Sequence, residues 1–178
     1  MTHTKERIIA AGFELFETTP FDDITVEDIL EKAYVSRGTF YRYFRDKYEV
    51  MYLYYSDFLH KNILAEFDGS NWAQLQEECY RFGSEHKAFF NNVKNNENQD
   101  GFWWYLTSVS IEIFRDIKCH NERRDTLTEE EEFTIRCYVE SAVFAFKQIV
   151  FSKTDLPIET VSRIIYDTLP EDYKRYIS

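Results

Sequence analysis

Residues 24–51 read ITVEDILEKAYVSRGTFYRYFRDKYEVM and carry three separate signals for the start of a helix. Thr25, with Asp28 three positions later, has the pattern of a capping box, in which each side chain satisfies a free backbone N–H group of the other residue. Ser36 is a favoured N-cap residue, and Asp46 opens another reciprocal pattern. The stretch therefore predicts two short helices and the beginning of a long one, at about 26–33, 37–43 and 47–66.

The second short helix combines aromatic and basic side chains. Phe40 and Phe44 are four positions apart and share one side of a helix, so we expect them to pack inward on the neighbouring helices. Arg37 lies at the N-terminal end, next to Gly38, whose missing Cβ lets another molecule approach the backbone closely. Two short helices joined by a tight turn form a helix-turn-helix, and the N-terminal end of its second helix reads the major groove of DNA.

Positive charge is concentrated in this stretch. Residues 34–48 carry three arginines and a lysine against one aspartate, a net charge of +3, so the remaining residues must carry −14 to give the chain's formal net charge of −11. An acidic chain is not a general nucleic-acid coat protein. This distribution of charge indicates a local basic DNA-binding segment on an otherwise acidic protein.

The composition favours one all-α chain in a reducing compartment. Of the 178 residues 44% are hydrophobic, which is enough for a core, and only five are Gly and three Pro. No apolar run approaches the ~20 residues of a membrane helix, and the N-terminus has no signal-peptide pattern. We therefore expect a cytoplasmic location and no membrane association. Three cysteines, an odd number, predict free thiols that are mostly buried.

The periodicity of the apolar residues predicts helices along the whole chain. A helix of 4–18 precedes the segment quoted above, and polar breaks separate four later helices, at roughly 72–94, 101–119, 128–152 and 157–169. The sequence predicts an N-terminal three-helix DNA-binding domain, residues 1–46, followed by a second α-helical domain, residues 47–178.

The quoted segment resembles the DNA-binding domain of the TetR family of bacterial repressors, and RIIAAGFELF at 7–16 resembles the family's first helix. The resemblance covers about residues 4–52. Two positions depart from the family pattern: Tyr34 stands in the turn where glycine is usual, and Tyr43 stands where histidine is common. A left-handed backbone at Tyr34 would be strained.

The resemblance implies a sequence-specific regulator that binds double-stranded operator DNA, a repressor released by a small-molecule effector. It also implies that residues 47–178 form an α-helical ligand-binding and dimerisation domain. Arginine donors suit guanine or phosphate, and hydroxyl groups suit phosphate oxygens. The candidate DNA-binding residues are Thr25, Val26, Ser36, Arg37, Gly38, Thr39, Tyr41, Arg42, Tyr43 and Lys47.

The rest of the chain carries weaker signals. The helices at 128–152 and 157–169 have apolar residues on more than one side, so we expect them to pair with a second copy in a homodimer. The alternative is that they form the core of a monomer. A small-molecule effector is expected between the helices at 47–66, 72–94 and 101–119. Its candidate residues, which an ordinary aromatic core would also explain, are Phe82, His86, Phe89, Phe90, Trp103, Trp104 and Tyr105. Control by a protein partner is the alternative.

No pattern indicates an enzyme, a cofactor or a metal. The sequence has no paired-cysteine metal spacing and no glycine-rich phosphate loop. Cys119 and His120 are neighbours on a helix and diverge. The acidic run at 128–133 is typical of a helix N-terminus, where negative charge is stabilising.

Overall fold

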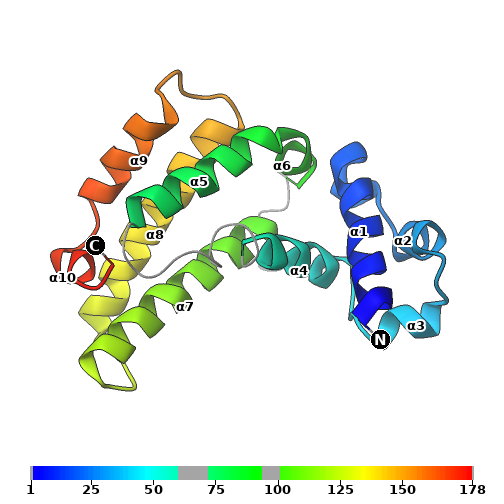
Figure 1. Ribbon diagram of the computed structural model, residues 1–178, viewed down its shortest axis with the longest axis horizontal. Helices are drawn as coiled ribbons and strands as arrows, with labels where there is room; N and C mark the ends of the chain where they lie inside the picture. Colours follow the sequence, from blue (N-terminus) through cyan, green and yellow to red (C-terminus); the bar gives the residue numbers. More distant parts are fainter. Residues whose placement is uncertain (1, 60–71, 94–100, 178) are drawn as a thin grey trace.

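The computed structural model describes residues 2–59, 72–93 and 101–177, and over these residues it is all-α, as predicted (Figure 1). One 3-10 turn and ten α-helices make up the described part. They are α1 (Thr2–Thr18), η1 (Phe21–Asp23), α2 (Val26–Ala33), α3 (Arg37–Tyr41), α4 (Lys47–Leu59), α5 (Trp72–Glu85), α6 (Lys87–Val93), α7 (Phe102–Glu122), α8 (Glu129–Val150), α9 (Ile158–Asp167) and α10 (Glu171–Lys174).

The helices form two groups joined by α4. Helices α1, α2 and α3 lie together at one end of the molecule, and α4 leads from them toward a larger bundle in which α8 packs on α5, α7 and α9 (Figure 1). Helix α6 leaves the bundle and packs against α1, so the two groups touch at a second place besides α4.

The predicted capping signals are present at three helix starts. The Thr25 hydroxyl accepts from the backbone N–H of Asp28, whose carboxylate accepts from the Thr25 N–H at 2.7 Å. The Ser36 hydroxyl caps α3 by accepting from the backbone N–H of Thr39. Thr128 opens α8 with a second capping box. These local bonds fix the ends of α2 and α3, and therefore the turn between them.

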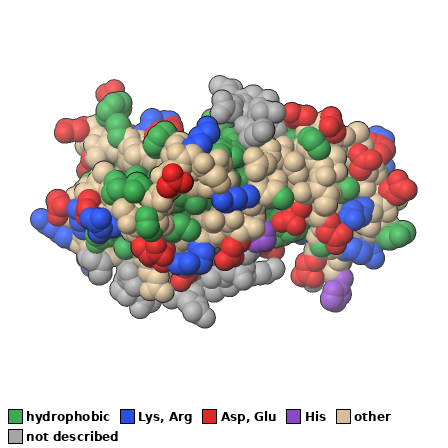
Figure 2. All heavy atoms as spheres, turned by 90° about the horizontal axis from the view of Figure 1, so that it is seen from above, with side chains coloured by type: hydrophobic (Ala, Val, Ile, Leu, Met, Phe, Trp, Pro, Cys, Tyr) green, Lys and Arg blue, Asp and Glu red, His purple; other side chains and the backbone are tan. Residues whose placement is uncertain are grey.

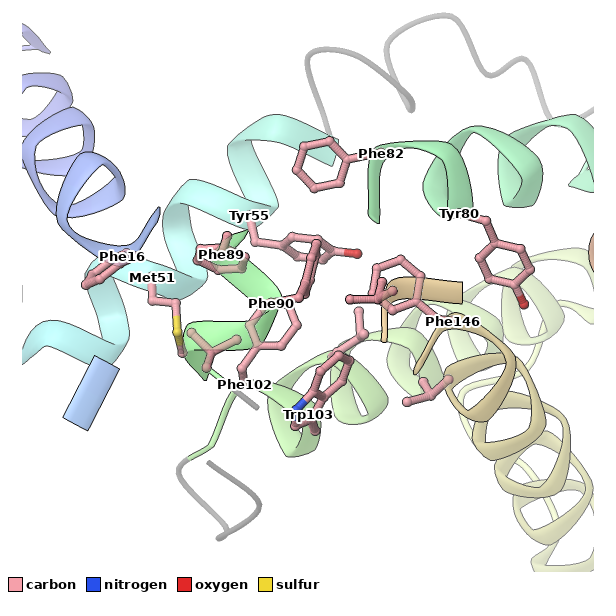
Figure 3. Close-up of a cluster of buried hydrophobic side chains, with 14 of the residues drawn as sticks. Phe16, Met51, Tyr55, Tyr80, Phe82, Phe89, Phe90, Phe102, Trp103 and Phe146 are labelled. Carbon is pink, nitrogen blue, oxygen red and sulfur yellow. The ribbon is translucent and has the colours of Figure 1, made fainter. Parts of the chain in front are cut away.

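Aromatic rings fill the interior where the two groups of helices meet (Figure 3). Phe89, Phe90 and Phe102 are at most 1% exposed, and the Phe90 ring lies edge-on to that of Phe102 with their centroids 5.5 Å apart. Edge-to-face aromatic pairs add to the burial of apolar area. Helices α4, α6 and α7 are thereby held together in one core.

The helix boundaries differ from the prediction in three places. The predicted helix of 72–94 is divided at His86 into α5 and α6, and the turn lets Phe89 pack against Phe13 and Phe16 of α1. Helix α3 is shorter than predicted and ends at Tyr41. Helix α10 and the turn η1 were not predicted. The end of the helix predicted at 47–66 lies outside the described residues.

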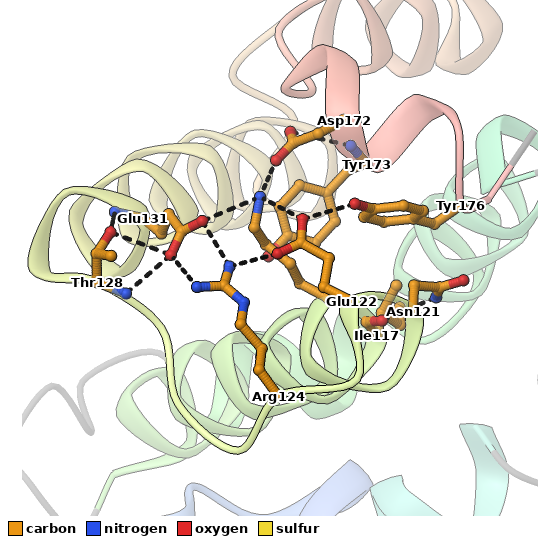
Figure 4. Close-up of polar contacts among 10 residues, drawn as sticks. Ile117, Asn121, Glu122, Arg124, Thr128, Glu131, Asp172, Tyr173 and Tyr176 are labelled. Carbon is orange, nitrogen blue, oxygen red and sulfur yellow. Dashed lines mark hydrogen bonds and ion pairs between the residues drawn. The ribbon is translucent and has the colours of Figure 1, made fainter.

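A cluster of charged side chains holds α10 against the α7–α8 corner (Figure 4). The Lys118 ammonium, 6% exposed, lies among the carboxylates of Glu122, Glu131 and Asp172. Arg124 makes two hydrogen bonds to Glu131, of 2.8 and 2.5 Å. Burial of Lys118 opposes its charge, but the hydrogen bonds to the carboxylates outweigh burial and raise the pKa of Lys118. The charge is buried but fully paired.

No helix among the described residues is long and apolar enough to cross a membrane. The three cysteines are free, as predicted. The prediction that they are mostly buried is wrong for Cys137, which lies exposed on α8, while Cys79 and Cys119 are half-buried.

Candidate functional site

Helix α3 is held by two inward-facing phenylalanines, one within the helix and one three residues after its end. Phe40 is 0% exposed and Phe44 is 2% exposed, and their ring centroids are 5.5 Å apart. Because this side is fixed in the core, the opposite side of the helix faces outward with Arg37, Gly38 and Tyr41 exposed. The predicted division of the segment into a buried aromatic side and an exposed polar side is therefore present in the structure.

Gly38 lies in open space. A Cβ built on it would meet no heavy atom within 4 Å. Packing inside the protein therefore gives no reason for glycine at this position of a helix, where alanine would be intrinsically more stable. The missing side chain leaves room for another molecule to approach the backbone of α3.

The arginines of the candidate interface already have partners within the protein. Arg37 forms an ion pair with Glu27 of α2, and both side chains are more than half exposed. Arg42 lies over the ring of the half-buried Tyr43, 5.1 Å from its centroid. The local excess of positive charge seen in the sequence is thus partly neutralised by α2. Figure 2 shows acidic and basic side chains interspersed on the face it presents, including the end of the molecule formed by α1, α2 and α3.

The short polar side chains of the candidate set mainly shape the helix-turn-helix. Thr25 and Ser36 are the N-caps of α2 and α3, and the Ser36 hydroxyl lies 2.9 Å from that of Thr39. Val26 is half-buried and packs against the core. Their positions at the exposed helix starts are compatible with contact to a phosphate, since free N–H groups and hydroxyls gather there.

The turn between α2 and α3 has the left-handed backbone that the family's usual glycine would adopt. Tyr34 has φ 51° and ψ 50°, and its N–H bonds the carbonyl groups of Leu30 and Glu31 while the Val35 N–H bonds Leu30. This is the common way to end a helix. The Tyr34 side chain is 88% exposed and covers no core. The turn geometry is therefore kept despite the tyrosine, at the cost of a strained residue.

Lys47 differs most from its predicted placement. Its ammonium donates hydrogen bonds of 2.6 Å to the carbonyl groups of Phe21 and Ile24 and lies 4.4 Å from the centroid of the Phe21 ring. Burial lowers the pKa of Lys47, while the carboxylates of Asp22 and Asp23 oppose that shift. Two of the three N–H donors of Lys47 therefore bond carbonyl groups inside the domain, and its contact with a phosphate stays a prediction.

A separate cavity of about 130 Å³ lies within the larger helical group, between α5, α7 and α8. Its walls are almost entirely apolar. The lining residues are Tyr55, Trp72, Leu75, Gln76, Cys79, Tyr80, Leu106, Ser110, Ile113, Phe114, Tyr138, Val139, Ala142, Val143 and Phe146.

Most polar groups of the cavity wall are bonded to each other. The Gln76 Nε2 group donates to the Tyr80 hydroxyl at 3.2 Å, which donates to the carbonyl of Ala142 at 3.1 Å. Trp72 Nε1 donates to the Tyr138 hydroxyl at 3.0 Å. The Gln76 Oε1 atom is buried without a hydrogen-bond partner. A buried acceptor in this state has lost its water and gained nothing in return.

None of the seven residues predicted for the effector site lines this cavity. Phe82, Phe89 and Phe90 belong to the solid aromatic core, as does Trp103, whereas Trp104 is 52% exposed. Trp103 and Trp104 therefore point apart, as neighbours on a helix must.

The two remaining candidates connect helices in place of lining a cavity. His86 Nδ1 lies 3.0 Å from a carboxylate oxygen of Glu17 in α1, and Tyr105 stacks on Tyr52 with ring centroids 4.1 Å apart. The cavity lies among the predicted helices, since Tyr55 of α4 lines it together with residues of α5 and α7, but the residues named from the sequence are not in its wall. The spacing of aromatic residues could not separate core from cavity wall, and Gln76, one polar residue in an apolar helix face, was the signal that was missed.

This chain is all-α over its described residues, with an N-terminal helix-turn-helix and a larger helical bundle. That combination is typical of helix-turn-helix regulators. Residues 8–51 match the family model described as bacterial regulatory proteins, tetR family. The matched residues contain the whole helix-turn-helix, which supports the assignment of this chain as a TetR-family transcriptional regulator. No curated protein sequence matches it significantly.

Two solved structures have a similar fold. One is the dihydroxyacetone kinase operon activator DhaS, at 19% sequence identity and a TM-score of 0.63, with 100% of both chains covered. The other is a TetR transcriptional regulator from Rhodococcus sp. RHA1, at 18% identity and a TM-score of 0.59, with 93% of this chain and 94% of that chain covered. At these identities the likeness concerns the fold alone.

Proposed function

We propose that this regulator binds operator DNA through the exposed side of α3 and that it is a repressor released when a small molecule occupies the cavity between α5, α7 and α8. The observation that carries the first part is the exposed side of α3 itself. Arg37 and Tyr41 project outward around a glycine that the protein's own packing does not require.

The chemistry of that side suits the major groove. The Arg37 guanidinium offers paired donors that match the acceptors on a guanine edge. Arg37 would leave its ion pair with Glu27 to make this contact with DNA. The Tyr41 hydroxyl and the Arg42 guanidinium suit phosphate oxygens on either side. Capping at Thr25 and Ser36 positions the two helix starts before DNA arrives, so little ordering remains to be done on binding.

A second copy is expected on α8 and α9. Phe133 and Phe144 of α8 are 69% and 62% exposed, and Ile164 of α9 is 45% exposed. Large exposed apolar side chains of this kind mark interfaces. A two-fold pairing through them would present two copies of α3 to successive major grooves, about 34–36 Å apart on a palindromic operator.

Helix α6 supplies the route from cavity to DNA-binding domain. Cys79 and Tyr80 line the cavity on α5, and His86, at the end of the same helix, contacts Glu17 of α1. Asn92 of α6 donates a 2.9 Å hydrogen bond to the carbonyl of Phe16, also in α1. A ligand that shifts α5 would therefore move α1 and change the separation of the two α3 helices of the dimer. Operator affinity falls by as much as the ligand binds this conformation more tightly than the DNA-binding one.

Control by a protein partner is the second candidate, and exposed aromatic side chains such as Trp104 favour it. The apolar cavity between α5, α7 and α8 favours a small molecule. The direction of regulation is open to test as well, because the similar structure of DhaS is named an operon activator, and the same DNA contact serves either outcome.

Selection of binding sites from random double-stranded DNA tests the DNA-binding proposal. We expect an inverted repeat to be recovered, with affinity reduced roughly 10- to 100-fold by Arg37→Ala and by Tyr41→Ala. Arg175→Ala, which changes an exposed arginine at the far end of the chain, is the matched control and should bind as the wild type does. Equal affinity of all three variants would overturn the assignment of α3.

Sedimentation velocity tests the dimer. Phe144→Glu is expected to shift the protein to monomer, while Trp104→Glu, a charge at an exposed aromatic residue outside α8 and α9, leaves a dimer. A wild-type protein that is monomeric at low micromolar concentration would contradict the proposed interface.

A further inference from the structure

We propose that Glu27 of α2 is an autoinhibitory residue of the DNA-binding site: it competes with the operator for Arg37 and lowers the affinity that α3 would otherwise reach. This inference rests on the proposed DNA contact of α3. It assigns a role in that contact to a residue of the neighbouring helix, which reaches the operator only through its effect on Arg37.

The ion pair joins the two helices of the helix-turn-helix through one atom of each side chain. Arg37 Nη2 is paired with Glu27 Oε1. A guanidinium can present its donors to a guanine edge in two pairs, Nε with Nη2 or Nη1 with Nη2, and both pairs include Nη2. Glu27 and a base therefore compete for the same donor nitrogen.

Glu27 is not needed to begin α2. The first turn of this helix contains two carboxylates, and the capping box uses the other one, Asp28, which accepts hydrogen bonds of 2.7 Å from both the backbone N–H and the hydroxyl of Thr25. The Glu27 side chain is 56% exposed and faces Arg37 instead. Removal of its charge therefore leaves the cap of α2 in place.

Neighbouring lysines are engaged elsewhere. Lys32 of α2 pairs with Glu14 of α1 at 2.8 Å, and Lys47 donates to backbone carbonyl groups inside the domain. Glu27 thus draws its positive partner from α3, the helix whose exposed side is the proposed DNA contact. The pair neutralises the guanidinium at the N-terminal end of α3, which is the end that enters a major groove.

The exposure of the pair sets the size of the effect. The two side chains are 63% and 56% exposed, and an exposed ion pair changes an equilibrium by roughly two- to fivefold. A good bidentate contact to guanine is worth more than this, so cognate DNA displaces Glu27. A dimer on an inverted repeat breaks one pair in each half-site, so the two pairs together should lower operator affinity by about 4- to 25-fold.

Fluorescence anisotropy of the full chain with the inverted repeat recovered from random duplex DNA tests the proposal. Glu27→Gln keeps the length of the side chain and removes its charge, so this variant should bind the operator about 4- to 25-fold more tightly than the wild type. Glu31→Gln makes the same change of net charge one turn further along α2, also at an exposed position, and is the matched control. It should bind within about twofold of the wild type.

The double variant Glu27→Gln with Arg37→Ala separates competition for Arg37 from general repulsion of phosphates. Without Arg37 there is nothing to compete for, so the double variant should bind as Arg37→Ala does, within the small change that Glu31→Gln produces. A gain from Glu27→Gln that is equally large with and without Arg37 would overturn the competition in favour of simple charge repulsion.

Two further outcomes would also overturn the inference. Unchanged operator affinity of Glu27→Gln would mean that the ion pair has no effect on binding, and weaker binding would mean that Glu27 positions Arg37 for DNA. In either case a loss of affinity in Arg37→Ala would leave the proposed DNA site intact. If Arg37→Ala itself binds as the wild type does, the DNA site on α3 is wrong and the role of Glu27 is lost with it.

Discussion

Helix α3 and the cavity between α5, α7 and α8 treat their polar groups in opposite ways. On α3 the polar side chains are exposed, and the apolar ones, Phe40 and Phe44, are buried behind them. In the cavity wall the polar groups of Gln76 and Tyr80 are buried and bonded to one another, with one acceptor left over. An exposed polar surface can exchange water for a charged polymer such as DNA. Buried polar groups that bond one another leave a cavity wall that is mostly apolar, which suits a small molecule and not a charged polymer.

The charged cluster around Lys118 sharpens this comparison, because it is a buried polar site in which every charge is paired. Lys118→Met removes the central charge and leaves three carboxylates facing one another, so we expect the free energy of unfolding to fall by about 2–3 kcal/mol. Urea denaturation at pH 7 measures the change. Lys153→Met, at an exposed position beyond α8, is the control and should change stability little.

The same cluster makes a prediction about pH. The Arg124 guanidinium and the backbone of Thr128 hold the pKa of Glu131 well below its ordinary value. A lowered folded-state pKa stabilises the protein above the unfolded pKa of about 4.3 and ceases to do so as the pH falls through the folded value. The urea midpoint of the wild type should therefore drop below pH 4.5, and that of Glu131→Gln should drop less. If the urea midpoints of the two proteins fall equally with pH, the pairing of Glu131 with Arg124 is contradicted.

Gly38 on α3 and Gly83 on α5 have different surroundings, and Gly83 is the one closely packed against other side chains. A Cβ there would lie 2.6 Å from the ring of Phe146 and 2.8 Å from Val150. Gly83→Ala should therefore lower the free energy of unfolding by about 1–3 kcal/mol through overpacking between α5 and α8. If the variant is as stable as the wild type, the close contact between α5 and α8 at Gly83 is contradicted.

Gly38 on α3 should give the reverse result. Gly38→Ala meets no atom of the protein, so its stability should be unchanged or higher by up to about 1 kcal/mol, as for alanine in any helix. Operator affinity should nevertheless fall by about tenfold or more, because the new methyl group stands where DNA approaches the backbone. Stability comes from chemical denaturation and affinity from anisotropy on the same preparation. Full operator binding by the variant would contradict close approach at this position.

Tyr34 gives the smallest expected effect. Tyr34→Gly removes the backbone strain of a tyrosine in the left-handed conformation, while glycine has more freedom in the unfolded chain. The first effect should be the larger, so we expect the free energy of unfolding to rise by about 0.5 kcal/mol. Tyr34→Ala keeps a Cβ and should bring no gain. A loss of stability in the glycine variant would mean that the exposed tyrosine ring makes a stabilising contact.

The helix-turn-helix could be predicted from sequence because its determinants are local. Capping at Thr25 and Ser36, and the spacing of Phe40 and Phe44, involve residues three or four apart. The Arg37–Glu27 pair and the inward Lys47 were missed, since they depend on how α2, η1 and α4 pack together.

The cavity could not be predicted because it is a property of tertiary packing. Aromatic residues on α5, α6, α7 and α8 look alike in sequence, and only the assembled bundle separates Phe90 in the core from Phe146 beside the cavity. A glutamine among apolar residues was the one local sign of the site. The division of the predicted helix at His86 was hidden for the same reason, since the partner of α6 is α1.

The central claim is that Arg37 reads a base and does not only attract phosphate. Binding of wild type and Arg37→Ala to every single-base variant of the selected operator tests it directly. The account predicts that the wild type loses about 1–3 kcal/mol at one base pair in each half-site on substitution, and that Arg37→Ala loses this discrimination at that pair alone. Uniform weakening of binding to all operator variants, with the base preferences unchanged, would contradict the account.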